Sequence, residues 1–123
     1  MNLSSRIFVA GHNGLVGSAI IRELKKKKFN KVITVTRSKL DLTNQQKVLN
    51  FLKKEKPDYI IIAAAKVGGI YSNNKYKAEF IYENLMIQSN LIHSAYLCKI
   101  KNLLFLGSSC IYPKECKQPI KEE

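Results

Sequence analysis

A glycine-rich turn between two apolar patterns is the feature that most constrains the fold of this chain. Residues 7–10 form a short apolar run typical of a strand, and Gly11, Gly14 and Gly17 follow it at three-residue spacing. Apolar side chains then recur on one helical face, at Val16, Ala19, Ile20 and Leu24. A strand, a tight glycine turn and a helix in this order can cradle a phosphate at the helix N-terminus. The turn therefore predicts a dinucleotide site, and the alternative is an ordinary glycine turn of an α/β protein.

Three further strand-like runs alternate with helical patterns along the rest of the chain. The runs are residues 32–36, 58–63 and 103–106, and the helices are expected from an N-cap at Thr43 and over residues 78–98. This alternation predicts an α/β fold with a doubly wound, Rossmann-like parallel sheet. Right-handed crossovers and a phosphate site on the first strand predict the strand order 3-2-1-4.

The chain is basic, with 21 Lys and Arg against 9 Asp and Glu and a formal net charge of +12. Of the 21, 18 are Lys, and they are scattered or gather at ends of the expected helices, where cations suit the dipole. The sequence has no aromatic-plus-basic RNA motif. We interpret the charge as a solvated surface that also steers an anionic ligand, and we expect no nucleic-acid partner.

The sequence also bears on membranes, metals and cell compartment. No apolar run approaches the ~18 residues that cross a bilayer, and the first residues lack a signal-peptide pattern. The three cysteines show neither metal-ligand spacing nor a disulfide framework. We therefore expect no membrane partner, no metal and a cytoplasmic location.

Polar residues after the second strand-like run are candidates for the adenosine end of a dinucleotide. NAD enzymes usually place an acidic residue there, whereas an arginine such as Arg37 suits the 2′-phosphate of NADP. Asp41 and Leu42 follow closely and could flank the adenine. The alternative for Arg37 is an ordinary exposed arginine. Lys66, after the third run, has two interpretations, as a phosphate contact or as a solvated loop lysine.

The last strand-like run ends in small residues that could carry chemistry. Ser108 and Ser109 could hydrogen-bond a substrate carbonyl, and Cys110 beside them could exchange a proton. Equally, the serines could satisfy loop backbone groups while Cys110 acts as a small apolar residue.

Four strings of residues together resemble the GDP-L-fucose synthases of the extended short-chain dehydrogenase/reductase family. They are Gly-His-Asn-Gly-Leu-Val-Gly (11–17), Ala-Ala-Ala-Lys-Val-Gly-Gly-Ile (63–70), Phe-Ile-Tyr-Glu-Asn-Leu-Met (80–86) and Leu-Gly-Ser-Ser-Cys-Ile-Tyr-Pro (106–113). The resemblance implies an NADP(H)-dependent enzyme that epimerises C3 and C5 of GDP-4-keto-6-deoxy-D-mannose and then reduces C4. It further implies a GDP-linked nucleotide-sugar substrate and a homodimer.

The resemblance also assigns residues. It implies that Ser108 hydrogen-bonds the C4 carbonyl and that Cys110 is an acid/base of the epimerisation. The cofactor-binding set that it implies is Gly11, His12, Asn13, Gly14, Leu15, Val16, Gly17, Arg37, Asp41, Leu42, Ala64, Asn84, Leu106, Gly107, Ser108 and Ser109.

Two features depart from the family pattern. Asn13 stands where the family often has a basic residue, which leaves Arg37, with Lys39, for the 2′-phosphate. The family's Tyr-x-x-x-Lys pair, its second acid/base and its substrate domain are expected beyond Glu123, so residues 1–123 are interpreted as a partial NADP-binding domain. We expect this part alone to bind NADP weakly and not to turn over substrate. The alternatives are another NADP-linked nucleotide-sugar epimerase or reductase, and a non-catalytic dinucleotide-binding module.

Overall fold

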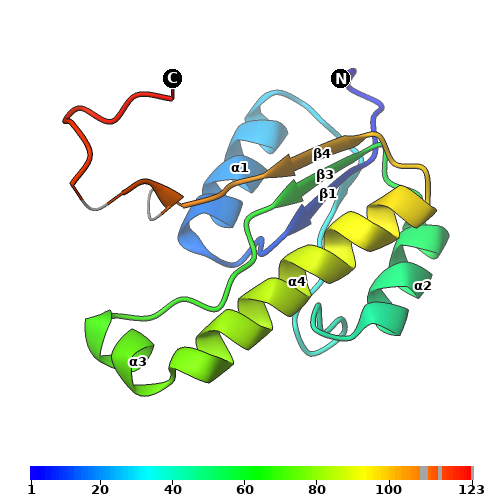
Figure 1. Ribbon diagram of the computed structural model, residues 1–123. Coiled ribbons are helices and arrows are strands. Elements are labelled where there is room, and N and C mark those ends of the chain that lie inside the picture. Colours follow the sequence, from blue (N-terminus) through cyan, green and yellow to red (C-terminus); the bar gives the residue numbers. More distant parts are fainter. Residues whose placement is uncertain (109–110, 114, 123) are drawn as a thin grey trace.

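The computed structural model contains a four-stranded parallel sheet with helices on both faces (Figure 1). It describes residues 1–108, 111–113 and 115–122. The strands are β1 (Ile7–Ala10), β2 (Val32–Ile33), β3 (Tyr59–Ile62) and β4 (Asn102–Phe105). The helices are α1 (Leu15–Lys26), α2 (Gln45–Glu55), α3 (Ile70–Lys75) and α4 (Lys77–Leu97). The predicted α/β class with a parallel, doubly wound sheet is confirmed.

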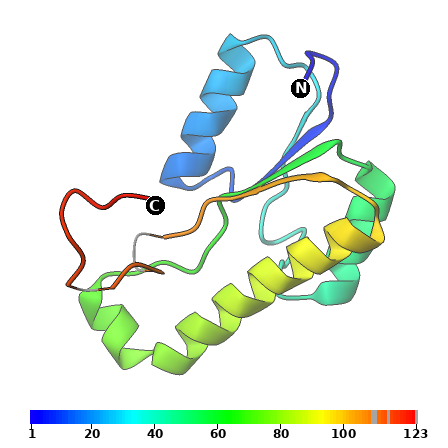
Figure 2. The same cartoon turned by 45° about the horizontal axis from the view of Figure 1, so that its top comes forward.

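The strands lie in the order β2-β1-β3-β4, so the predicted order 3-2-1-4 is wrong. Helix α1 covers one face of the sheet, and α2 and α4 cover the other (Figure 2). A right-handed crossover that moves to the opposite face also reverses its direction across the sheet. Because α2 lies on the face opposite α1, β3 lands on the far side of β1. The chain therefore changes direction between β1 and β3, which makes the gap between them the switch point.

Two apolar layers on the faces of β1 explain this arrangement. Ile7 and Val9 point toward α1, where they pack with Leu24. Phe8 and Ala10 point the other way, into a cluster with buried residues of α2, β3 and α4, namely Val48, Leu52, Ile60, Ile62, Leu91 and Ala95. All four residues of β1 are buried, as expected for a central parallel strand covered on both faces.

Helix α2 begins one residue later than predicted. The expected cap, Thr43, instead donates its backbone N–H and its hydroxyl to Oδ1 of Asp41, at 2.9 and 2.8 Å. Asn44 is the N-cap, and its Oδ1 accepts from the N–H of Lys47 at 2.9 Å. The prediction failed because the Asp41 carboxylate competes for Thr43 within a local turn.

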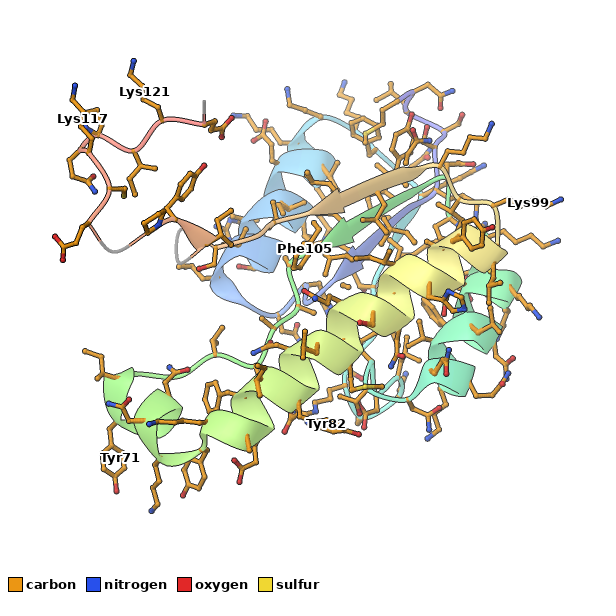
Figure 3. All side chains as sticks on the ribbon, viewed as in Figure 1. Tyr71, Tyr82, Lys99, Phe105, Lys117 and Lys121 are labelled. Atoms are coloured by element: carbon orange, nitrogen blue, oxygen red, sulfur yellow. The ribbon has the colours of Figure 1, made fainter. Side chains whose placement is uncertain are left out.

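Three lysines that follow helices have positive φ, which favours glycine. Lys28, Lys56 and Lys99 have φ of 63°, 43° and 58°. Beyond Lys28 and Lys99 the N–H of the next residue donates to the fifth carbonyl back, at 3.0 and 2.9 Å, as in Schellman ends. Figure 3 shows Lys99 projecting outward from the end of α4.

We expect Lys28→Gly, Lys56→Gly and Lys99→Gly each to raise the free energy of unfolding by about 1 kcal/mol, because glycine adopts this conformation without steric cost. Urea unfolding followed by circular dichroism measures the change. Lys27→Gly is the matched control, since Lys27 has φ of −80° and should gain nothing. A loss of stability in all three variants would contradict this interpretation of the helix ends.

Candidate functional site

A cleft of about 390 Å³ lies at the carboxyl ends of β1 and β3, where the chain changes direction across the sheet. It is lined by the turn after β1, the loops after β2 and β3, and Glu83 and Ile87 of α4. Ligands of open parallel sheets bind at such a point. A larger hollow of about 490 Å³ lies at the opposite edge of the sheet and exposes four lysines, Lys53, Lys56, Lys99 and Lys101. We therefore place the site in the cleft.

The glycine turn packs too closely for side chains at two positions. Gly11 has φ of +86°, and a Cβ there would lie 2.6 Å from the backbone nitrogen of Ala64. A Cβ on Gly17 would lie 2.1 Å from the carbonyl oxygen of Gly11. The N-cap of α1 is Gly14, which has no side chain to cap the helix, and the first residues of α1 line the cleft. The turn thus presents backbone N–H groups and the positive end of a helix to any anion in the cleft.

The loop after β2 forms the second wall of the cleft. Arg37, Asp41 and Leu42 all line it, and the Arg37 side chain is 76% exposed. Two hydrogen bonds from Thr43 hold the pKa of the Asp41 carboxyl below its ordinary value, and the one from the backbone N–H has the larger effect. Asn90 of α4, a buried residue, donates Nδ2 to the carbonyl of Leu42 at 2.9 Å. Helix α4 therefore holds the loop after β2 in place through the contact between Asn90 and Leu42.

The loop after β3 is fixed by the same helix. Oδ1 of Asn84 accepts from the N–H of Lys66 at 2.8 Å, and its Nδ2 donates to the carbonyls of Lys66 and Phe80 at 3.0 and 2.9 Å. Asn84 lies outside the cleft, in an adjoining hollow beside α3 and α4. Its amide is engaged by the main chain, which makes it a support for the loop that carries Lys66.

Glu83 joins the second and third walls. Its Oε1 lies 2.5 Å from Nζ of Lys66, and its Oε2 lies 3.3 Å from Nη2 of Arg37. The hydrogen bond from Lys66, then the charges of Lys66 and Arg37, hold the pKa of Glu83 below its ordinary value. Lys66 is therefore the half-buried partner of a carboxylate rather than a solvated lysine, and its contact with a phosphate stays a prediction.

Sequence reasoning missed Glu83, although a signal was present. Glu83 stands in a four-residue series with Ile87, Leu91 and Ala95, which point from α4 toward the sheet. A carboxylate in line with a buried apolar stripe indicates a partner of opposite charge.

The structure gathers most of the predicted cofactor residues at one place. Those that line the cleft are Gly11, His12, Asn13, Gly14, Leu15, Val16, Arg37, Asp41, Leu42 and Ala64. Gly17 is buried under the turn. Leu106, Gly107 and Ser108 follow β4 at the same edge of the sheet but do not line this cleft, and Ser109 and Cys110 lie outside the described residues. Contact of these residues with a cofactor or a substrate stays a prediction.

Over residues 1–108, 111–113 and 115–122, no helix is long and apolar enough to span a membrane. In the same residues, no group of three His, Cys, Asp or Glu side chains is placed to hold a metal ion.

Known proteins share this fold and much of this sequence. The model of the NAD dependent epimerase/dehydratase family matches residues 7–123. GDP-L-fucose synthase 1 of Arabidopsis thaliana is 60% identical over 119 residues, which are 97% of this chain and 37% of that protein. GDP-L-fucose synthase of Escherichia coli (strain K12) is 51% identical over 117 residues, 95% of this chain and 36% of that protein.

A solved structure described as MlghC, GDP-mannoheptose C4 reductase from Campylobacter jejuni with NADP bound, superposes with a TM-score of 0.93 at 45% identity. The superposition covers 98% of this chain and 38% of the reductase chain. The chain thus spans little more than a third of the length of the curated relatives it matches.

Proposed function

The chain belongs to the NAD dependent epimerase/dehydratase family, and from this premise we propose that it is the cofactor-binding part of a GDP-L-fucose synthase. The observation that carries the proposal is the cleft at the switch point, where the glycine turn, Arg37 and the loop after β3 meet. The identities of 51% and 60% to GDP-L-fucose synthases over nearly the whole chain support it.

NADP(H) is the proposed cofactor, and the cleft has the features that this dinucleotide needs. The close backbone at Gly11 and Gly17 leaves room for a pyrophosphate beside the uncapped N-terminus of α1. Arg37 would bind the 2′-phosphate, and Leu42 and Ile87 offer apolar contact to the adenine. When bound, the dinucleotide would supply the hydride that reduces C4 of the sugar.

The residues after β4 complete the proposal. Ser108 would donate its hydroxyl to the C4 carbonyl of the keto sugar and stabilise the oxyanion that develops there. Cys110 would exchange protons at C3 or C5. Inversion needs a proton removed from one face and another returned to the opposite face, so Cys110 would act with a second acid/base.

We include a cytoplasmic location and a homodimer in the proposal. The homodimer is proposed because α4 carries more apolar surface than the sheet covers. Ile81, Leu85 and Ile92 of this helix are 62, 48 and 45% exposed. Tyr82 projects from the side of α4 that faces away from the sheet (Figure 3). A second copy would bury this surface.

We expect the full protein to convert GDP-4-keto-6-deoxy-D-mannose and NADPH to GDP-L-fucose, identified by NMR, with deuterium at C3 and C5 when the reaction runs in D2O. A product reduced at C4 without deuterium at C3 and C5 would replace the proposal with a simple C4 reductase. Binding of NADPH without consumption of it would replace the proposal with a non-catalytic dinucleotide-binding module.

A further inference from the structure

Glu83 stands between the two cations that line the cleft. Lys66 comes from the loop after β3 and Arg37 from the loop after β2, and each contacts a different oxygen of the Glu83 carboxylate. The two loops are joined by this one side chain of α4 across the cleft wall. A ligand that engages Arg37 must therefore share it with Glu83 or displace Glu83.

The two halves of this bridge differ in how firmly they are held. The Lys66 side chain is 28% exposed, and its backbone is fixed by Asn84 on both the N–H and the carbonyl. The Arg37 side chain is 76% exposed and lies in a loop. The contact of Glu83 with Lys66 is thus the anchored half, and the contact with Arg37 is the half that a ligand can exchange.

We propose that Glu83 is a specificity-determining residue, whose carboxylate competes with the 2′-phosphate of the dinucleotide for Arg37. This inference rests on the proposed function, because it takes Arg37 as the phosphate-binding group. A phosphate monoester is a stronger partner for a guanidinium than a carboxylate is, but Glu83 adds a like charge beside it. Glu83 therefore lowers the preference of the site for NADPH over NADH.

The test compares NADPH and NADH binding to the full protein and to its Glu83→Gln variant, by fluorescence titration. Glutamine keeps the size of the side chain and removes its charge, which weakens its contact with Arg37. We expect the Kd for NADPH to fall about fivefold and the Kd for NADH to change less than twofold. Glu79→Gln is the matched control, since Glu79 is exposed in the first turn of the same helix and should leave both constants unchanged.

A second variant pair asks whether the effect acts through Arg37. In an Arg37→Met background, Glu83→Gln should no longer improve NADPH binding, because the group competed for is gone. A fivefold improvement that persists in this background would overturn the competition, as would an unchanged ratio of the two Kd values in Glu83→Gln. Weaker NADH binding in Glu83→Gln would also overturn it, since Glu83 would then bind the ribose hydroxyls. If the unaltered protein binds neither dinucleotide, the proposed function fails and this inference with it.

Discussion

Gly11→Ala and Gly17→Ala should each weaken NADPH binding about 100-fold, a change of about 3 kcal/mol. At Gly11 the added Cβ would meet the backbone of Ala63 and Ala64 at 2.6 to 2.7 Å, and φ of +86° adds about 1 kcal/mol of steric cost. At Gly17 it would lie 2.1 Å from the Gly11 carbonyl oxygen, so α1 must move away from the turn. Either shift misplaces the N–H groups that face the cleft.

Two other glycines provide a graded comparison. Gly14→Ala places its Cβ 3.4 Å from the Gly11 carbonyl oxygen, a contact that a small shift can relieve, so this variant should fold and bind with an intermediate loss. Gly69→Ala is the control, because no atom of the described residues lies within 4 Å of its Cβ. Isothermal titration gives the affinities, and thermal unfolding shows which variants stay folded. Full affinity in Gly11→Ala and Gly17→Ala would remove the turn from the binding site.

Most elements of this fold could be predicted from sequence because their signals are local, whereas the short helix α3 was not predicted. The run at residues 7–10 and the three glycines identify a strand, a turn and a helix within 20 residues of chain. The order of the strands could not be predicted in the same way. An amphipathic helix shows that one side is buried, but not which face of the sheet it covers. That choice depends on how Val48 and Leu52 of α2 meet Phe8, and it reverses the direction in which the chain crosses the sheet.

The side-chain contacts that support the site could not be predicted from the sequence for a related reason. The contacts of Arg37 with Glu83 and of Asn90 with Leu42 join residues 46 and 48 positions apart. The helical pattern of α4 indicates which side of the helix these polar side chains lie on. Their partners lie on loops whose positions are set by the sheet, so the contacts cannot be predicted from the pattern. The glycine turn differs from these contacts, because its three-residue spacing and the close approach of Gly17 to Gly11 lie within one short stretch of sequence.

Asn84→Ala should lower the free energy of unfolding by about 2 kcal/mol and weaken NADPH binding about tenfold. The substitution removes three hydrogen bonds of the Asn84 amide, two to Lys66 in the loop after β3 and one to the carbonyl of Phe80 within α4. It leaves the partly buried Lys66 N–H and carbonyl without their partner. The loop after β3 then loses its attachment, and with it the position of Lys66 and Ala64 in the cleft. Gln88→Ala, one turn later on α4 and beside the same outer hollow, is the control and should change neither quantity.

The pattern across the two dinucleotides separates this role from that of Glu83. A loosened loop disturbs the cleft whether or not the ligand carries a 2′-phosphate. Asn84→Ala should therefore weaken the binding of NADPH and of NADH to the same extent. Urea unfolding and fluorescence titration on the same samples measure both effects. Weaker binding at unchanged stability would show instead that Asn84 touches the cofactor, as the family resemblance implies. Equal loss for both ligands, together with lower stability, would show that α4 organises the cleft through its amide contacts while Glu83 adjusts its choice of ligand.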